Sequence, residues 1–422
     1  MKQDNKYLIV LGRGREGAGC TRLAIEHCNY LNSHGSYAKI LAGADKRWGR
    51  EDAHIGEFTN YSFAKQLDDA LSMANEFTHI LLMSVPAKNY DKECQDNFMK
   101  FIEAMHNQGK KIVYLQFDHK IHSINRNMYA LPEYYSIFKF FDLILTYSPN
   151  GDFVKFCNKH NIEIKKLLTS QDDGIDCLNG TDFASLKAFW KPFSQKESKT
   201  IKFIGRSAAW KGPYMFRDVH EKVFKSHGYI STCEGIELSL GSLQFLFKEL
   251  KPNRLLRDDT VLLHKKNEIQ AVKDGTFNFE RNHCIYMMPP YIRNEALERL
   301  SRCQFGIELL CLADNMLGDI IEMAMLEIIG VGCIPIFRKK WCQAFKVGGK
   351  PLADYAFNES GTIVLDEENP EDAVRIMDAL AKNSVAYEKT RAIAYDFYSK
   401  HFSSDVIYDK LYKMIDNKLE EL

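Results

Sequence analysis

The stretch LIVLGRGREGAGCTR, from Leu8 to Arg22, is a short apolar run followed by four closely spaced glycines and a helix-like segment. Glycines that follow a strand let backbone N–H groups come close to an anion, and the N-terminus of the next helix favours negative charge. This stretch therefore predicts a strand, a glycine turn and a helix that together hold an anionic ligand.

The glycine turn alone does not decide which anion it holds. Gly12, Gly14 and Gly17 satisfy the dinucleotide pattern G-x-G-x-x-G, but the acid expected about 20 residues later is not well placed, because Asp45 comes late. The turn also matches the Walker phosphate loop, except that Cys20 replaces the lysine that holds the β- and γ-phosphates. A nucleotide-sugar diphosphate is the third reading, and a tight turn without any ligand is the fourth.

Apolar runs and amphipathic segments alternate through most of the chain, which indicates βαβ units and parallel sheets. The polar, lysine-rich segment Lys187–Thr200 interrupts the alternation and predicts a linker. We therefore predict an α/β protein with two open domains, residues 1–195 and 196–395, and a helical tail from about residue 373. The expected strands are KYLIVLG, YAKILAG, HILLMSV, KKIVYLQF and FDLILTYS, then IKFIG, HCIYMMP, QFGIEL, GCIPIF and GTIVL, and the expected early helices span about 21–34, 61–76 and 94–107.

The composition argues against several classes of protein. Lys+Arg and Asp+Glu are both 56 in 422 residues, so a polyanionic partner needs a local basic surface rather than the field of the whole protein. The eleven cysteines contain no C-x-x-C pair, which is typical of reduced thiols and not of a disulfide framework or a zinc site. No signal peptide begins the chain, and no apolar run approaches the roughly 20 residues of a membrane span. The sequence predicts a cytoplasmic protein.

Two segments of the second half carry groups suited to a nucleotide diphosphate. FIGRSAAWKG places Arg206 just after a strand and Lys211 at the start of the next helix, where both cations suit a leaving group whose negative charge grows. DIIEMAMLEIIGVGCIPIF carries Asp319, Glu322 and Glu327 in one expected helix, and Glu327 can accept hydrogen bonds from a ribose diol. Taken singly, Arg206 and Lys211 fit solvated cations beside a helix better than a ligand site, and the three acids also fit the solvent-exposed face of a helix.

Eight motifs in one order give the chain its resemblance to a known family. The chain resembles the GT-B retaining glycosyltransferases, and among them the DNA α-glucosyltransferases of T-even bacteriophages, which glucosylate 5-hydroxymethylcytosine. The resemblance spans most of the chain and implies two Rossmann-like domains with a UDP-sugar between them. The motifs are RGREGAGCTR (13–22), SVPA (84–87), FDHKIHSINRN (117–127), NGDF (150–153), IGRSAAWKGPYMF (204–216), EGIE (234–237), LERLS (297–301) and MLEIIGVGCIPIF (325–337).

The resemblance also implies the architecture at the C-terminus and the cofactor requirement. A C-terminal helix, about residues 396–422, would return to the first domain. No metal and no other cofactor would be required, because the UDP-sugar is the donor substrate, and the sequence has no D-x-D pair to hold a metal. The partners implied are double-stranded DNA containing 5-hydroxymethylcytosine and the UDP-sugar, with no membrane.

Site roles follow from the resemblance, residue by residue. The resemblance implies that Arg206 and Lys211 clamp the diphosphate and that Glu327 binds the ribose. Asp118 falls on an acidic position beside the sugar and the acceptor, and Glu322 on a carboxylate that faces the transferred sugar. Backbone N–H groups near the phosphates would come from Gly17, Ala18 and Gly19. The acceptor hydroxyl would lose its proton to a phosphate oxygen or to Asp118.

Two positions depart from the family pattern. Phe117 stands where the family has a histidine that can hydrogen-bond the hydroxymethyl group of a hexose, and phenylalanine cannot donate such a bond. Asp319 stands where the relative carries a basic residue. These departures suggest a pentose donor such as UDP-arabinose beside UDP-glucose, although one changed pocket group alters specificity only modestly.

A DNA-modifying enzyme also needs a cationic surface. Basic residues that could contact DNA phosphates flank the Asp118 motif and follow the NGDF motif. If these residues line one surface, DNA binding would depend on salt and be largely independent of DNA sequence. Most single lysines are only solvated side chains. The DNA-binding candidates are Lys120, Arg126, Lys155 and Lys159, and further lysines considered are Lys110, Lys111, Lys165, Lys166, Lys187, Lys191, Lys196, Lys199, Lys265 and Lys266.

Three other functions stay open at this stage. A GT-B enzyme could use a small molecule, glycan or lipid as acceptor instead of DNA. A nicotinamide-dependent oxidoreductase would use the glycine turn but gives Arg206 and Lys211 no role. A nucleotide-sugar sensor would bind UDP without transferring a sugar.

Overall fold

The computed structural model describes residues 5–12, 19–42, 61–63, 66–118, 121–147, 151–169, 177–206, 211–236, 260–263, 271, 284–287, 293–311, 318 and 320–422. At residues 61–63, 122, 205–206, 214, 235–236, 260–263 and 284–287 it describes the backbone alone. The chain divides into two compact units, Met1–Gly180 with Ser404–Leu422, and Thr181–Ser403. Both predicted domain limits, 195/196 and 395/396, fall inside the second unit.

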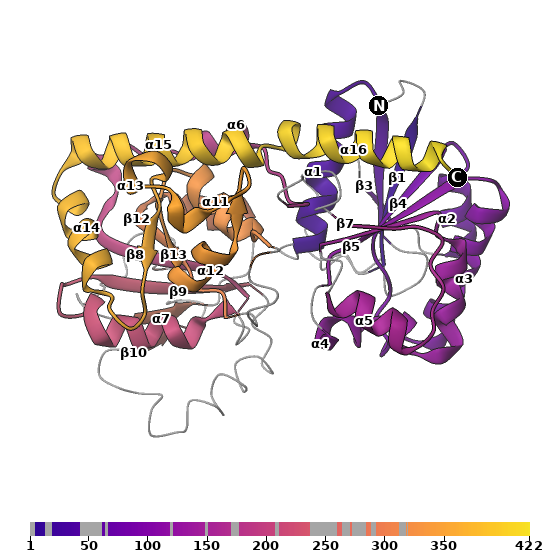
Figure 1. The fold of residues 1–422 in the computed structure, drawn as a ribbon, viewed down its shortest axis with the longest axis horizontal. Helices are drawn as coiled ribbons and strands as arrows, with labels where there is room; N and C mark the ends of the chain where they lie inside the picture. The colour runs from indigo at the N-terminus through magenta and orange to yellow at the C-terminus, as the bar shows by residue number, and fades with distance from the viewer. Residues whose placement is uncertain are drawn as a thin grey trace. The chain divides into compact units, whose positions relative to one another are not determined.

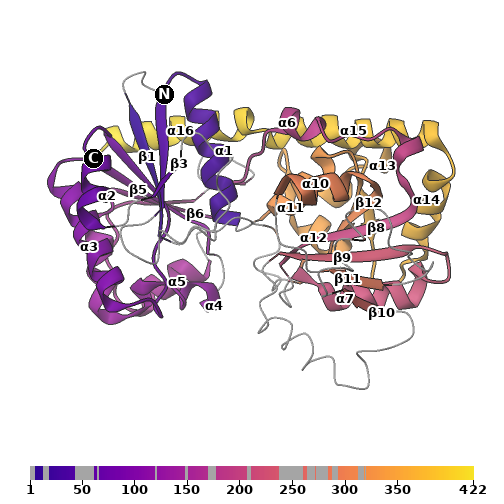
Figure 2. The same ribbon diagram turned by 180° about the vertical axis from the view of Figure 1, so that it is seen from behind.

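The first unit is built on a parallel seven-stranded sheet with the order β3-β2-β1-β4-β5-β6-β7. Helix α1 (Gly19–Ser33) lies on one side of this sheet, and α2 (Leu67–Ala74) and α3 (Lys92–Asn107) lie on the other (Figures 1 and 2). Its strands are β1 (Lys6–Leu11), β2 (Tyr37–Ala42), β3 (Tyr61–Phe63), β4 (His79–Ser84), β5 (Lys111–Gln116), β6 (Leu143–Thr146) and β7 (Leu167–Thr169). The shorter elements are α4 (Ile121–Ile124), η1 (Met128–Ala130), η2 (Pro132–Phe140) and α5 (Asp152–Lys159).

Apolar side chains on both faces of the central strands explain why this sheet is buried. In β1, Leu8 and Val10 join the core that also contains Phe98 and Phe101 of α3. The neighbouring Tyr7 points to the other face, where its ring centroid lies 5.5 Å from that of Tyr412. Strands buried on both faces are typical of a parallel sheet covered by helices.

Helix α16 (Ser404–Glu420), the last of the chain, completes the first unit by packing against α1 (Figure 1). His27 Nδ1 lies 2.8 Å from the hydroxyl oxygen of Tyr412, and burial lowers the pKa of His27 to about 3. Tyr408 donates a hydrogen bond to the Gly180 carbonyl oxygen at 3.0 Å. Neutral His27 and the hydrogen-bonded hydroxyls of Tyr408 and Tyr412 thus hold α16 against the first unit, in a contact that is otherwise aromatic.

The second unit has its own parallel seven-stranded sheet, with the order β10-β11-β9-β8-β12-β13-β16. Figure 2 shows α10 (Arg293–Ser301) and α11 (Met323–Gly330) on one side of it and α7 (Pro213–Val219) on the other. Its strands are β8 (Glu197–Arg206), β9 (Ile230–Ile236), β10 (Thr260–Leu263), β11 (Cys284–Met287), β12 (Cys303–Glu308), β13 (Ile334–Arg338) and β16 (Ile363–Leu365). Its other elements include α6 (Phe183–Lys187), η3 (Phe193–Gln195), η5 (His220–Phe224), α12 (Lys339–Ala344), α13 (Phe357–Ser360), α14 (Glu371–Ala381), α15 (Ser384–Phe402) and the antiparallel pair β14 (Lys346–Val347) and β15 (Lys350–Pro351).

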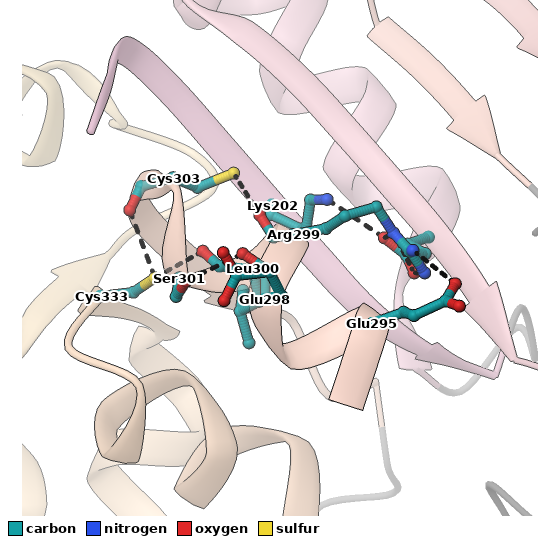
Figure 3. Close-up of polar contacts among 9 residues, drawn as sticks. Lys202, Glu295, Glu298, Arg299, Leu300, Ser301, Cys303 and Cys333 are labelled. Carbon is teal, nitrogen blue, oxygen red and sulfur yellow. Dashed lines mark hydrogen bonds and ion pairs between the residues drawn. The ribbon is translucent and has the colours of Figure 1, made fainter. Parts of the chain in front are cut away.

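A buried ion triad ties α10 to the sheet of the second unit (Figure 3). The Arg299 guanidinium donates through Nε to both carboxylate oxygens of Glu234 at 3.1 and 3.2 Å, and the Lys202 ammonium donates to the same carboxylate at 3.1 Å. The three side chains are 8%, 1% and 5% exposed in the order Arg299, Glu234 and Lys202. The motifs EGIE and LERLS therefore meet each other through this triad.

Two sequence predictions about local structure are wrong. The predicted linker belongs to the second unit, because β8 begins at Glu197 and the buried Lys196 donates to the carbonyl oxygens of Cys303 and Gly332, both at 3.0 Å. The helix predicted over 61–76 begins only at Leu67, because Tyr61–Phe63 pairs with β2 as the edge strand. Of the cysteines that the structure describes, most are buried, as predicted, and no described helix is long and apolar enough to cross a membrane.

Candidate active site

The topology of each sheet identifies where a ligand would bind. In a doubly wound sheet, ligands gather at the carboxyl ends of the strands where the strand order reverses. In the first unit this point lies between β1 and β4, and in the second unit it lies between β8 and β12. The predicted site residues follow these strands and the neighbouring β5.

The first glycine of the turn is required by a close approach of two loops. Gly12 N–H donates to the Ser84 carbonyl oxygen at 2.8 Å, and a Cβ on Gly12 would lie 2.4 Å from the backbone carbon of Val85. No side chain fits there, so the turn after β1 packs directly on the SVPA segment after β4. Gly19 is the first residue of α1, whereas Gly17 and Ala18 lie outside the described residues.

The SVPA segment also contacts Met128 and Asn127, the residue whose side chain supports Asp118. Met128 N–H donates to the Pro86 carbonyl oxygen at 2.8 Å, and Ala87 forms an isolated bridge with Asn127. The fully buried Asn127 amide then donates to Asp118 Oδ2 at 2.8 Å. Two of the sequence motifs, SVPA and FDHKIHSINRN, are therefore joined at the residue that holds the Asp118 carboxylate.

The Asn127 amide nitrogen is shared among three acceptors, one of which is the Ser123 carbonyl oxygen at 3.3 Å. Besides Asp118, it donates to the Tyr129 hydroxyl oxygen at 2.8 Å, and Gln116 Nε2 donates to the Asp118 backbone carbonyl at 2.9 Å. Side chain and backbone of Asp118 are both fixed by these contacts. An amide N–H can only donate, so Oδ2 is held as an acceptor oxygen. Asn127 was not singled out from the sequence, because nothing distinguishes it from the other polar residues of its motif.

Phe117, directly before Asp118, has an aromatic neighbour. Its ring centroid lies 5.8 Å from that of Tyr147, which follows β6. The Tyr147 hydroxyl donates to Asn179 Oδ1 at 3.0 Å. Phe117 is half-buried, and its described ring contact is with the aromatic ring of Tyr147.

In the second unit, Lys211 and Glu322 form an ion pair at the switch point. Lys211 Nζ lies 2.9 Å from Glu322 Oε2, and the two side chains are 8% and 18% exposed. Gly212 follows with φ +77°, and a Cβ there would lie 2.2 Å from the Leu309 carbonyl oxygen. The loop before α7 is therefore pressed onto the end of β12, which fixes the position of Lys211.

The other predicted residues of this unit are only partly visible. Arg206 is the last residue of β8, but its side chain lies outside the described atoms, as does all of Asp319. Glu322 is the N-cap of α11 rather than a residue within it, because its φ and ψ are −79° and 148°. The prediction that one helix carries Asp319, Glu322 and Glu327 is therefore wrong for Glu322.

Two residues of this region were missed by the sequence analysis. Arg293, at the start of α10, donates through Nε to Glu327 Oε1 at 3.0 Å. Glu308, the last residue of β12, is fully buried. Burial raises the pKa of Glu308 to about 8, with Lys211 opposing and Glu322 adding to that shift. Neither residue carries a local sequence signal, because Arg293 meets Glu327 from a distant segment and Glu308 is distinguished only by its burial.

The DNA-binding candidates that the structure describes are exposed. Arg126, Lys155 and Lys159 are all exposed, and Lys120 lies outside the described residues. Asp152 Oδ2 accepts a hydrogen bond from Ile121 N–H at 2.8 Å, which joins the start of α4 to the start of α5. Lys155 therefore lies on a helix that contacts α4, the element preceding Arg126.

Two lysines considered for the cationic surface are internal instead. Lys110 Nζ donates to the carbonyl oxygens of Asn75 and Phe77, at 3.1 and 2.6 Å, and Lys196 is the buried lysine described above. Both amines serve as donors to backbone carbonyls. Among the residues with described positions, no group of three or more His, Cys, Asp and Glu side chains could hold a metal ion.

Two Rossmann-like units, each with the ligand position at its switch point, define the GT-B class of glycosyltransferases. Comparison with known proteins narrows the class. A family model described as DNA alpha-glucosyltransferase matches residues 18–385, and the chain belongs to this family. The predicted α/β GT-B fold and the predicted family are both confirmed.

Individual relatives agree with this assignment over nearly the whole chain. The DNA alpha-glucosyltransferase of Enterobacteria phage T4 is 27% identical over 421 residues, which cover 97% of this chain and 99% of the relative. A solved alpha-glucosyltransferase in complex with UDP-glucose and DNA containing an abasic site has a TM-score of 0.83 at 25% identity, covering 97% and 99% of the two chains. Anabaena Alr3699/HepE in complex with UDP and glucose shares the fold, with a TM-score of 0.54 at 12% identity and coverage of 98% and 100%.

Proposed function

We propose that this chain transfers a sugar from a UDP-sugar to 5-hydroxymethylcytosine in double-stranded phage DNA, with retention of configuration at the anomeric carbon. The observation that carries the proposal is the Lys211–Glu322 pair at the switch point of the second unit, in a member of this family. Solved relatives bind UDP-glucose and DNA. We place the activity in the cytoplasm, as expected for an enzyme that modifies phage DNA.

The second unit would bind the UDP part of the donor. Lys211 exchanges its contact with Glu322 for the diphosphate, and together with Arg206 it neutralises the charge that grows as the bond from C1 to the phosphate oxygen breaks. Glu322 then faces the transferred sugar. Glu327 accepts hydrogen bonds from the ribose hydroxyls, and Arg293 holds that carboxylate in place.

The first unit would supply the acceptor side of the reaction. The hydroxymethyl oxygen of the base attacks C1 on the face that the diphosphate leaves, and a new C1–O bond forms. The hydroxyl proton passes to a phosphate oxygen or to Asp118, whose Oδ2 accepts a hydrogen bond from the Asn127 amide. The backbone N–H groups of Gly17, Ala18 and Gly19 would lie near the phosphates.

DNA would be held chiefly through its phosphates. Arg126, Lys155 and Lys159 are exposed at or near α4 and α5, and Lys120 precedes α4 in the sequence. Each phosphate contact that is lost should reduce the slope of log K against log salt by about 0.9 for duplex DNA. The double variant R126A/K155A is therefore expected to bind all duplexes more weakly, with a shallower salt dependence. As the control, K382A changes an exposed lysine of the other unit and should leave the slope unchanged.

Glucose is the first candidate for the transferred sugar, and a pentose is the second. The observation that favours a pentose is the apolar contact of Phe117 with Tyr147, because a phenyl ring offers no donor to a hexose hydroxymethyl group. Asp319, where the relative has a basic residue, is the second departure. Phe117→His should raise kcat/KM for UDP-glucose relative to UDP-arabinose if Phe117 selects the sugar.

One experiment tests the function directly. Radiolabelled sugar is offered as UDP-glucose or UDP-arabinose to duplexes with and without 5-hydroxymethylcytosine, and incorporation is counted. We expect label only in the modified duplex. No incorporation from either donor would refute the proposal. Absence of DNA binding at low salt would instead favour a GT-B enzyme for a small molecule, glycan or lipid.

A further inference from the structure

Glu308 is a buried carboxyl group that the reaction described above does not use. It ends β12, one of the two strands that flank the switch point of the second unit, and it is 0% exposed. Within the part of the chain that the structure describes, neither carboxyl oxygen has a hydrogen-bond partner. An ionised carboxylate in such a place is costly, and a buried carboxyl group without partners is a candidate for a functional role.

The electrostatic surroundings of Glu308 are those of the diphosphate site. Lys211 favours its charged form and Glu322 opposes it, while burial is the largest effect and raises the pKa to about 8. The Gly212 backbone touches Leu309, the residue after Glu308, so the lysine loop lies directly on this strand end. The charged side chains that the structure describes on the surrounding elements include the ion pairs Lys202 with Glu234, Glu327 with Arg293, and Arg338 with Glu367.

We propose that Glu308 is a positioning residue of the diphosphate site, where it remains an uncharged carboxylic acid. Lys211 then has only the Glu322 carboxylate, and not also that of Glu308, to exchange for the donor phosphates. The inference rests on the proposed role of Lys211 in donor binding. With Glu308 neutral, the Lys211–Glu322 pair has no net charge before the donor arrives. With Glu308 ionised, a further negative charge lies beside the place that the diphosphate must occupy.

This arrangement makes donor affinity depend on pH in a defined way. Binding of the diphosphate favours the protonated form of Glu308, so UDP and the proton on Glu308 bind cooperatively. At pH values above the pKa of Glu308 in the unliganded protein, the affinity for UDP should fall by up to tenfold per pH unit. Between pH 7 and pH 9.5 this amounts to a loss of up to about 30-fold, if the liganded protein keeps the proton throughout.

The test is the pH dependence of UDP affinity in the full chain. Isothermal titration calorimetry with UDP is performed from pH 7 to pH 9.5 on the wild type and on Glu308→Gln, which keeps the shape but cannot ionise. Glu308→Met gives the same comparison if the amide destabilises the unit, and thermal unfolding checks that each variant is folded. Asp372→Asn, which removes an exposed carboxylate of α14, is the matched control and should follow the wild type.

The outcome is read from one ratio. The affinity of Glu308→Gln divided by that of the wild type should rise at least threefold between pH 7 and pH 9.5. A smaller rise overturns the assignment of Glu308 while leaving the proposed function intact. Absence of UDP binding by the wild type at pH 7 rejects the proposed function, and this inference with it.

Discussion

The buried triad of Lys202, Glu234 and Arg299 gives the sharpest prediction about stability. Glu234→Gln keeps the side-chain volume but leaves two buried cations without their carboxylate. Removing one partner of a buried ion pair typically costs about 3–5 kcal/mol, because the remaining charge is not compensated. We expect a loss of that size in the free energy of unfolding of the second unit at pH 7.5.

The assay must report on the second unit alone, since a protein of two units need not unfold in one step. Of the four tryptophans in the sequence, Trp190, Trp210 and Trp341 belong to the second unit and Trp48 to the first. Urea unfolding is therefore followed by tryptophan fluorescence in a Trp48→Phe background. With a slope of about 2–3 kcal/mol per molar urea, the midpoint should fall by roughly 1–2.5 M.

The pH dependence supplies an independent check on the triad. Burial raises the pKa of Glu234, but Lys202 and Arg299 outweigh burial and hold it below the usual value. The stability that ionised Glu234 contributes is therefore present above the unfolded pKa of about 4.3 and is lost as the pH falls from there through the folded pKa. A difference below 1 kcal/mol at pH 7.5, or one that does not shrink in acid, would refute the reasoning. Asp372→Asn should stay within about 0.5 kcal/mol of the wild type.

Three further substitutions test the candidate site residues of the two units. Lys211→Met should lower kcat/KM for sugar transfer about 10- to 150-fold, the loss of one charge-assisted contact, measured with saturating DNA and limiting UDP-glucose. Asn127→Ala should lower kcat with little change in the UDP affinity, because it releases Asp118; an unchanged kcat would contradict the role of that amide. Gly212→Ala should weaken UDP binding and destabilise the second unit, because its Cβ would meet Leu309 at 2.2 Å and φ is +77°; a variant as stable as the wild type would show that the loop moves easily.

Periodicity predicted most of the sheet framework because buried parallel strands are continuous apolar runs. The strands KYLIVLG, HILLMSV and KKIVYLQF correspond to β1, β4 and β5, which are buried along nearly their whole length. The three-residue edge strand Tyr61–Phe63 was absorbed into the following helix, since so short a run has no period of its own. Lys110 and Lys196 were wrongly considered for a cationic surface for a different reason. Their amines donate hydrogen bonds to backbone carbonyls that are distant in sequence, and composition cannot distinguish such lysines from solvated ones.

The candidate site was predictable only where a residue sits in a local motif. Lys211 and Glu327 were found because a glycine turn and a strand accompany each of them. Asn127, Arg293 and Glu308 were missed because their roles depend on partners brought together by the sheet, and a single polar residue at a strand end or helix start is common. The roles of these three residues follow from tertiary contacts and not from a local sequence pattern.

The docking of α16 on the first unit has a consequence for how the protein is made. The first unit needs residues 404–422, which the ribosome synthesises only after the whole of the second unit. Chains generally fold from the N-terminus as they emerge, so the first 180 residues must wait, with the α1 surface uncovered, until residues 404–422 have also been synthesised. A nascent chain therefore cannot complete its first unit before its second unit has been synthesised, and a synthetic peptide of residues 404–422 should complement a chain truncated after Ser403.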